Sequence, residues 1–358
     1  MRIVQLNPYY YPYKGGIERR LHEICRRLSK KHEMIVLTSQ LKDTELEEEM
    51  DGYTIKRLPS KFYTNYNPPH VSTPGVLQAL NDLEPDLVDF HYRWAPSYTK
   101  AMKSYGGKWV FTFHNTYGEG QGPMRYLSTM NDFFFCQMIR DKNVICVSDF
   151  VKNDLISRDF KEENLDVIPT GVDFVTDSGK DENFILFVGR LVKTKGLSTL
   201  IEAMKNVDCK LVIAGTGPEE ELLRSMVGKY DLTDKVEFTG YVDEETKTRL
   251  MTTCSAFVMP SVFESLGLAA EEALAHCKPV IASRVGGLPE VVGNAGILIP
   301  PKEPQALSDA INAVMVDKEL RDNLISNTKT QIQKYNWDNI VNDLEAVYLK
   351  NIENNSQS

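Results

Sequence analysis

The chain has 358 residues, and its hydrophobic content of 42% and charged content of 25% are typical of a soluble globular protein with room for two domains. The net charge of −9 makes it a poor candidate for binding nucleic acid. No stretch approaches the ~20 apolar residues of a membrane span, no signal peptide is expected, and six irregularly spaced cysteines indicate reduced thiols in a cytoplasmic protein.

Strand-like and helical patterns alternate along the first half, which predicts an α/β domain with a mostly parallel sheet. A helix is expected over 17–31, between the first two strands. The acidic stretch 45–51 is expected to be a turn, and 61–74, rich in proline, asparagine and aromatic residues, a loop over a cleft. The expected strands are 2–6, 34–39, 54–58, 87–91, 109–113, 144–147 and 166–168.

The stretch 170–182 is polar, contains glycine and shows no periodicity, so it is the expected interdomain linker. A second alternating series follows it, and the chain beyond Pro304 is expected to be helical. The expected strands of this half are 184–188, 210–214, 236–239, 256–259, 279–282 and 297–299. The expected helices are 196–206, 218–230, 243–253 and 267–276. Two doubly wound domains would place their ligand sites at the carboxyl ends of the strands.

The predicted helix 17–31 carries a cluster of cations. A basic helix face can contact anionic lipid at a membrane surface, and it can equally be an ordinary solvated face. Both interpretations stay open, so that peripheral membrane contact is one expectation for this helix. The cations are Arg19, Arg20, Arg26, Arg27, Lys30 and Lys31.

The stretch 260–283 reads as a strand end, a turn, a helix and a second strand. Glu264 falls in the turn and Glu272 within the helix. The unpaired amides at the start of that helix favour an anion such as a phosphate, and the carboxylates suit hydroxyls of a sugar and a ribose. The alternative is that Glu264 only faces the helix dipole and Glu272 is solvated. The amides in question belong to Ser265, Leu266, Gly267 and Leu268.

Glycine turns and two cations fall at the same predicted sheet edges. Gly15 and Gly16 follow the first strand and open a helix, where backbone without a Cβ can approach a ligand. Arg190 and Lys195 follow the strand 184–188 and suit a diphosphate, although each alone is more often a surface cation. The turn at Gly215 lacks the third glycine of a dinucleotide fingerprint, so NAD binding is not expected.

Two histidines, His91 and His114, end predicted strands of the first half. Each can contact substrate from a cleft or serve a structural role, and the pattern does not decide between these. No DxD motif and no histidine–carboxylate cluster with metal spacing occurs, so no essential metal is expected. Positive charge for a leaving group would then come from Arg190, Lys195 and helix dipoles.

The ordered set of motifs resembles family 4 of the retaining glycosyltransferases, which have the GT-B fold, over nearly the whole chain. The segments that carry the resemblance are GGIE at 15–18, the strand-end His114, IPTGVD at 168–173, GRLVKTKG at 189–196, AGTGPE at 214–219, FTGYV at 238–242, ESLGLAAEE at 264–272 with the spacing of a Glu-x7-Glu signature, GGLPEVV at 286–292 and YNWDNI at 335–340.

The resemblance implies two Rossmann-like domains that face a central cleft, with a C-terminal helix that crosses back. The first, acceptor-binding domain would span 1–175 and be completed by about 336–358, and the second, nucleotide-sugar-binding domain would span 176–335. The family transfers a sugar, here a hexose, from a nucleoside diphosphate with retained configuration and no essential metal. Departures are Thr170, where asparagine is usual, and Ser265-Leu266, where Pro-Phe is frequent; both leave the sugar pocket's shape open.

The family also implies roles for single residues. Arg190 and Lys195 would hold and stabilise the leaving diphosphate, with Gly16 and the amides of the 265–268 turn as further donors. Glu264 would bind donor-sugar hydroxyls and Glu272 the ribose. The backbone near Tyr241 would contact the base, and His114 would lie near the reacting centre.

Donor and acceptor are not fixed by these motifs. UDP is expected on family frequency, with GDP-mannose as the alternative, and a catalytically silent sugar-nucleotide-binding protein is the competing function. The acceptor would be a glycan, a glycolipid or a lipid-linked glycan, met at the inner face of the membrane if it is a lipid. The loops 61–74 and 116–126 are candidates for binding it, through Tyr63, Tyr66, His70, Tyr117 or Tyr126.

Overall fold

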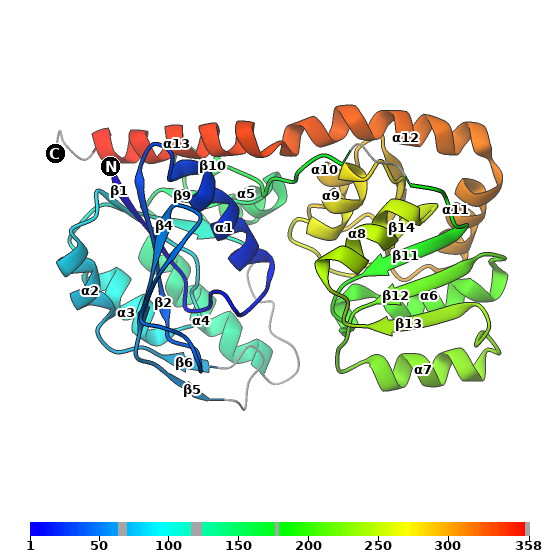
Figure 1. Cartoon of the computed structure of the whole chain (residues 1–358), viewed down its shortest axis with the longest axis horizontal. Helices are drawn as coiled ribbons and strands as arrows, with labels where there is room; N and C mark the ends of the chain where they lie inside the picture. The colour runs from blue at the N-terminus through cyan, green and yellow to red at the C-terminus, as the bar shows by residue number, and fades with distance from the viewer. Residues whose placement is uncertain (64–69, 116–123, 176–178, 355–358) are drawn as a thin grey trace. The chain divides into compact units, whose positions relative to one another are not determined.

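The computed structural model describes residues 1–63, 70–115, 124–175 and 179–354, with the backbone alone for 124–128 and 354. The chain forms two compact units, each with its own sheet (Figure 1). The first unit comprises Met1–Thr170 and Trp337–Ser358, and the second comprises Gly171–Asn336. The division after Thr170 falls at the start of the linker expected over 170–182, and Val172 already pairs with Asn336 of the second unit.

The first unit contains an eight-stranded sheet in the order β10-β9-β8-β7-β1-β2-β4-β3. All its pairs are parallel except β3 with β4. The strand order reverses at β1, which pairs with both β2 and β7, so the loops after β1 and β7 leave the sheet side by side. The bounds are β1 Arg2–Leu6, β2 Glu33–Ser39, β3 Glu47–Met50, β4 Tyr53–Leu58, β7 Leu87–Phe90, β8 Trp109–Phe113, β9 Val144–Cys146 and β10 Leu165–Val167.

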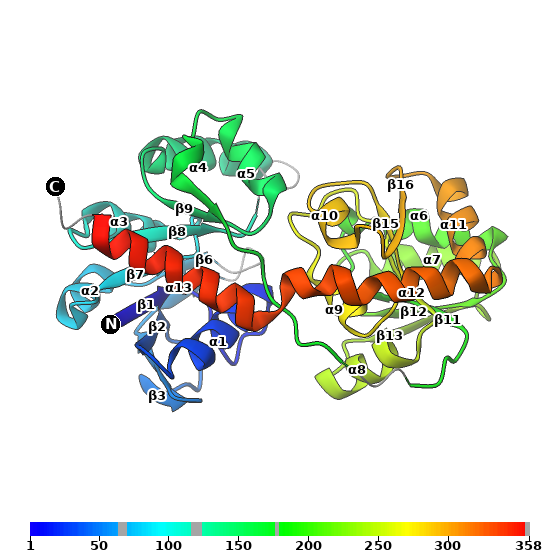
Figure 2. The same cartoon turned by 90° about the horizontal axis from the view of Figure 1, so that it is seen from above.

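Helices cover this sheet, and one of them returns from the C-terminus. α13 buries Trp337, Leu344 and Tyr348 in the same core cluster as Ile3 and Leu21, which confirms the expected return of the terminal helix to the first domain (Figure 2). The helices of the unit are α1 Gly16–Leu28, α2 Val76–Leu83, α3 Pro96–Ser104, α4 Met124–Ile139, α5 Asp149–Ile156, a 3-10 turn Glu162–Asn164 and α13 Trp337–Asn354.

The second unit contains a six-stranded, fully parallel sheet in the order β13-β12-β11-β14-β15-β16. Its order reverses between β11 and β14, where ligands bind in open α/β sheets. Its strands are β11 Phe184–Val188, β12 Lys210–Ala214, β13 Val236–Gly240, β14 Ala256–Met259, β15 Val280–Ser283 and β16 Gly296–Ile299. Its helices are α6 Leu197–Ala203, α7 Glu220–Lys229, α8 Glu244–Thr253, α9 Leu268–Ala275, α10 Leu288–Val292, α11 Pro304–Val316 and α12 Lys318–Ile332, with 3-10 turns at Lys193–Lys195, Met204–Asn206 and Gln333–Tyr335.

Two segments of the first unit differ from the sequence-based expectation. The acidic stretch 45–51 is not a turn, because Glu47 to Met50 form the antiparallel edge strand β3. Its alternate glutamates face solvent, and Glu47 meets Lys56 of β4 at 3.3 Å. The stretch 61–74 is not only a loop, since Lys61–Tyr63 (β5) pairs antiparallel with His70–Ser72 (β6). Both misses are short edge strands, which carry little apolar signal.

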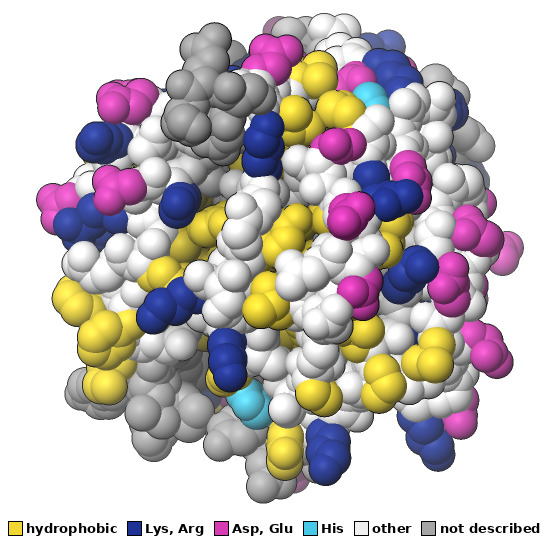
Figure 3. Space-filling view, turned by 90° about the vertical axis from the view of Figure 1, so that its left-hand side faces the viewer, with side chains coloured by type: hydrophobic (Ala, Val, Ile, Leu, Met, Phe, Trp, Pro, Cys, Tyr) yellow, Lys and Arg dark blue, Asp and Glu magenta, His cyan; other side chains and the backbone are white. Residues whose placement is uncertain are grey.

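The predicted basic helix is shorter and less basic than expected. α1 ends at Leu28, and Arg20 is 1% exposed, so its charge does not belong to a surface. The face drawn in Figure 3 carries lysine and arginine side chains interspersed with acidic ones. Across the described ranges, no helix is both long and apolar enough to cross a membrane. The six cysteines are free, and all but Cys277 are buried.

Candidate active site

The switch point of the second sheet brings two predicted motifs together. The loop after β11 carries Lys195, and the loop after β14 leads to Glu264. The two loops are bonded to each other, since the Val262 amide donates to the Thr194 carbonyl at 2.8 Å. Gly196 has φ +68°, and a Cβ there would lie 1.9 Å from the carbonyl oxygen of Pro260. Gly196 is therefore required for the two loops to pack this closely.

Lys195 and Glu264 form an ion pair in this position, with Nζ 2.5 Å from Oε2. Their side chains are 23% and 16% exposed, so the pair is partly shielded yet open to a ligand. Arg190, the other predicted diphosphate ligand, is exposed, and its side chain makes no hydrogen bond or ion pair within the described residues. The site therefore offers one paired cation, one exposed cation and one carboxylate.

The start of α9 borders this pair. Its N-cap Gly267 has φ +111°, and the amides of Leu266, Gly267 and Leu268 donate no hydrogen bond within the described part of the chain. Unpaired amides at a helix N-terminus attract anions. Gly286, at φ +57°, lets the following turn pack against Glu264, because a Cβ would lie 1.5 Å from the Glu264 carbonyl oxygen.

Glu272, the predicted ribose ligand, is not simply solvated. Its Oε1 lies 3.2 Å from Nζ of Lys247 on α8, and Lys247 also meets Glu244 at 2.8 Å. Sequence reasoning missed Lys247, because it belongs to no motif and only the packing of α8 beside α9 brings it near. The ion pair with Lys247 orients the Glu272 carboxylate.

The ends of β11, β12 and β13 pack through glycines. Gly215 has φ +141°, its amide donates to the Gly240 carbonyl at 2.7 Å, and a Cβ on it would lie 1.9 Å from the Gly189 carbonyl oxygen. These turns form a low backbone surface beside Arg190. Tyr241, which follows Gly240, is 69% exposed. An exposed aromatic ring at the rim of a sheet edge is free to stack on a base.

The predicted glycine pair of the first unit begins α1. Gly15 is the N-cap, and both glycines are exposed. A Cβ on Gly15 would lie 2.4 Å from Oε2 of Glu18, a buried carboxyl group that accepts a hydrogen bond from Asn7 at 3.2 Å. Burial raises the pKa of Glu18 to about 7. Sequence reasoning did not single out Glu18, whose burial beneath the glycine turn is visible only in the fold.

His114 follows β8, and its Nε2 lies 2.9 Å from Nδ1 of His91, which follows β7. Burial, the neighbouring His91 and the charge of Arg20 hold the pKa of His114 well below its usual range. The ring is therefore neutral at physiological pH. The sequence did not decide which of the two strand-end histidines contacts substrate, and in the structure they are hydrogen-bonded to each other.

The described residues contain no group of three or more histidine, cysteine or acidic side chains that could hold a metal ion. Of the predicted acceptor contacts, Tyr63 and His70 lie across the β5–β6 ladder with ring centroids 6.0 Å apart. Tyr66 and Tyr117, and the side chain of Tyr126, lie outside the described residues.

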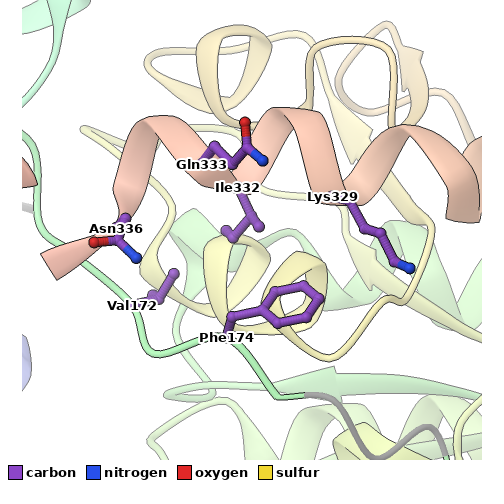
Figure 4. A pocket seen from close by; sticks show the side chains of 6 residues that line it. All are labelled: Val172, Phe174, Lys329, Ile332, Gln333 and Asn336. Carbon is purple, nitrogen blue, oxygen red and sulfur yellow. The ribbon is translucent and has the colours of Figure 1, made fainter. Parts of the chain in front are cut away.

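An open pocket of about 280 Å³ lies elsewhere in the second unit (Figure 4). It is formed where the segment after Thr170 passes α12, and the Val172 amide donates to the Tyr335 carbonyl at 2.8 Å beside it. None of the predicted site residues lines it, so it is separate from the candidate active site. Its lining consists of Val172, Phe174, Lys329, Ile332, Gln333 and Asn336.

Comparisons with known proteins agree with this architecture. Residues 172–331 match the model of the glycosyl transferases group 1, and residues 14–175 match that of Glycosyltransferase Family 4. An uncharacterized glycosyltransferase of Methanocaldococcus jannaschii is 30% identical, over 95% of each chain. The phosphatidyl-myo-inositol mannosyltransferase of Mycobacterium leprae is 26% identical, over 97% of this chain and 96% of that one.

The fold is shared with solved structures. HepE of Anabaena, in complex with UDP and glucose, superposes with a TM-score of 0.80 at 20% identity, covering 98% of this chain and 100% of that one. This likeness, together with the two parallel-sheet units, confirms the predicted GT-B fold. The matches at both halves and along the full length identify the chain as a member of glycosyltransferase family 4, a hexosyltransferase.

Proposed function

We propose that this chain transfers a hexosyl group from a nucleoside diphosphate sugar to a hydroxyl of a glycan or glycolipid, with retained configuration and without an essential metal. The observation that carries the proposal is the Lys195–Glu264 pair at the switch point of the second sheet, beside the start of α9. Cation, carboxylate and unpaired amides are the groups that a sugar diphosphate requires.

The diphosphate is bound by Lys195, by Arg190 and by the amides of the α9 N-terminus. When the bond between the anomeric carbon and the phosphate oxygen breaks, negative charge grows on that oxygen, and these groups stabilise it without the help of a metal. Glu264 accepts hydrogen bonds from hydroxyls of the transferred sugar. Glu272 binds the ribose, and Tyr241 lies beside the base.

The acceptor hydroxyl forms its bond to the anomeric carbon on the face that the diphosphate leaves. Its proton passes to the departing phosphate oxygen, so the reaction balances without a protein nucleophile or a separate base. The family resemblance adds Gly16 as a further donor to the diphosphate and His114 as a residue near the reacting centre. Retention and these roles derive from the family resemblance, and the ion pairs and helix start described above are compatible with them.

The donor is proposed to be a UDP-sugar, since UDP is the nucleotide in the HepE complex, and GDP-mannose is the alternative. A lipid acceptor is favoured by the relative that is named for mannosylating phosphatidyl-myo-inositol. Membrane contact through α1 belongs to the same proposal. It is weakened by the structure, because Arg20 is interior and Arg26 and Arg27 both bind Glu23.

The test is incubation of the purified chain with a panel of labelled sugar nucleotides and glycolipid acceptors. The expected result is release of nucleoside diphosphate and an α-linked product from an α-linked donor, the anomeric configuration being read by NMR. The Glu264→Gln variant is the matched control, because it keeps the size of the side chain and removes its charge. A chain that binds a sugar nucleotide in a thermal-shift assay but releases no diphosphate with any acceptor would contradict the proposed transfer.

Lipid contact is tested separately by co-sedimentation with vesicles. Binding to phosphatidylglycerol-containing vesicles, absent with phosphatidylcholine alone and reduced in a Lys30→Glu variant, is expected. Equal sedimentation with both vesicle types would show that α1 does not recognise anionic headgroups. Transfer to a soluble acceptor is unaffected by that outcome.

A further inference from the structure

A continuous chain of buried polar side chains lies beneath His114 in the first unit. Its members come from three elements: Gln5 from β1, Asp89 and His91 from β7 and its end, and Tyr348 from α13. None of these four is more than 3% exposed. Polar groups in a sheet core cost free energy unless each is hydrogen-bonded. Here each side chain is hydrogen-bonded to the next, and this series of hydrogen bonds ends at half-buried His114.

The direction of each hydrogen bond follows from the carboxylate. The Tyr348 hydroxyl donates to Oδ2 of Asp89 at 2.6 Å, because an ionised carboxylate only accepts. The hydroxyl oxygen then accepts from Nε2 of Gln5 at 2.9 Å. This fixes the Gln5 amide, whose Oε1 lies 2.8 Å from Nε2 of His91. The His91 hydrogen must therefore be on Nε2.

The same argument continues to His114. Burial and the charge of Arg20 hold the pKa of His91 well below its usual range, so the ring is neutral and its Nδ1 is an acceptor. Nε2 of His114, 2.9 Å away, must donate to it. The remaining ring nitrogen of His114, Nδ1, then carries a lone pair and no hydrogen.

We propose that Asp89, Tyr348, Gln5 and His91 are positioning residues that hold His114 with its hydrogen on Nε2, so that Nδ1 accepts a hydrogen bond from a sugar hydroxyl. A neutral acceptor repels a phosphate oxygen and suits a hydroxyl, which assigns His114 to the sugar and not to the diphosphate. The inference rests on the proposed function, because it states what His114 does to a sugar substrate.

The direction in which these side chains donate and accept hydrogen bonds depends on the charge of Asp89. Burial raises the pKa of this carboxyl group to about 7, against hydrogen bonds from Tyr348 and Thr112 that lower it. Once protonated, Asp89 can donate to Tyr348, and every later hydrogen bond, including that of His114, can reverse. The other titratable or charged groups that face Asp89 or the two histidines are Cys25 and Arg20 of α1, Tyr348 of α13 and Arg93.

The direct test is the 15N NMR spectrum of the full chain labelled in its histidine rings, recorded at pH 8.5, where Asp89 is ionised. Nδ1 of His114 is expected to give a pyridine-type resonance and Nε2 a pyrrole-type one, with the signals assigned from a His114→Ala variant. The opposite assignment in the wild type would overturn the proposal. This readout needs no substrate, so it stands even if no sugar nucleotide is turned over.

The second test is the Tyr348→Phe variant, which removes the hydroxyl that sets the Gln5 amide. A mixture of His114 tautomers is expected, with kcat lowered about tenfold, the worth of one buried hydrogen bond, and an unchanged Kd for the nucleoside diphosphate. Tyr98→Phe is the matched control, since Tyr98 is equally buried and its hydroxyl binds Ser39 at 2.7 Å, away from this chain.

Each outcome of this comparison either supports or contradicts the positioning role. Loss of kcat together with the tautomer change, in Tyr348→Phe and not in Tyr98→Phe, supports the positioning role. An unchanged kcat in a Tyr348→Phe protein that folds would overturn it, and so would equal losses in both variants, which would mark a general loss of stability. If the proposed function itself were wrong, the wild type would release no nucleoside diphosphate, which is a different result from those above.

Discussion

Replacing Lys195 by alanine removes the paired cation of the candidate site and leaves Glu264 without the partner that lies 2.5 Å away. Two effects are expected. The leaving diphosphate loses one electrostatic donor, which typically costs about 3 kcal/mol of transition-state stabilisation, or roughly a hundredfold in kcat. The fold loses a partly exposed ion pair, which contributes about 1 kcal/mol or less to stability.

The two effects separate by measurement. Nucleoside diphosphate release gives kcat, and thermal unfolding gives the stability of the second unit. We expect kcat to fall roughly a hundredfold while Tm changes by a few degrees at most. Glu264→Gln removes the same ion pair and keeps the cation, so it reports the loss of the pair alone. In the double variant, the stability effects of the two changes should be less than additive, because both delete one interaction.

The reasoning would be refuted by a Lys195→Ala enzyme whose kcat stays within a factor of a few of the wild type. In that case the 2.5 Å pair would be a structural clamp between the loops after β11 and β14, and Arg190 would have to carry the diphosphate alone. A large fall in Tm would also contradict the reasoning, because a partly exposed ion pair is expected to contribute only about 1 kcal/mol or less to stability.

Two further predictions concern metal and pH. Transfer should survive EDTA, because Arg190, Lys195 and the α9 amides supply the positive charge; complete loss of activity, restored by one divalent ion, would contradict this. Asp89 has a pKa raised to about 7 from an unfolded value of about 4, so its contribution to stability is lost as pH rises through that window. The Tm of the wild type should therefore fall relative to that of Asp89→Asn between pH 5 and 8, and parallel Tm curves would show that Asp89 does not titrate there.

Much of the fold could be predicted from the sequence, because buried parallel strands are short apolar runs between turn residues. The strands at 184–188, 210–214 and 256–259 match the structure at both ends. β3 was missed because it is an edge strand of three consecutive glutamates and a methionine, whose pairing with β4 is set by the turn at Gly52, at φ +87°. A strand that buries little leaves no apolar signal.

The site was predictable only in part. Motifs located the residues at the ends of strands, but pairing across the sheet depends on packing. Lys195 and Glu264 are 69 residues apart, and Gln5 and Tyr348 are 343 apart. A single sequence carries no record of which distant residues meet. The same is true of Glu18, which lies beneath the turn at Gly15, and of Lys247, which reaches Glu272 from α8.

Arg20 shows most clearly what sequence patterning cannot decide. In the sequence it is one of six cations of a basic helix, whereas in the structure its guanidinium is interior. It donates to the carbonyls of Ile168 and Pro169 and, at 3.1 Å, to the hydroxyl of Thr170. These are the residues at which the chain leaves the first unit. Arg20 therefore holds the segment where the chain leaves the first unit against α1.

The charge of Arg20 also acts on the buried chain beneath His114, where it lowers the pKa of both histidines and of Asp89. Replacing Arg20 by methionine, which keeps the length of the side chain, should cost about 3 kcal/mol through the unsatisfied carbonyls, or roughly 6–12 °C in the Tm of the first unit. The His114 pKa, followed by NMR, should rise towards its ordinary value. Lys30→Met, at an exposed position near the end of the same helix, should change neither. Unchanged stability in Arg20→Met would mean that burying this guanidinium costs as much as its hydrogen bonds return.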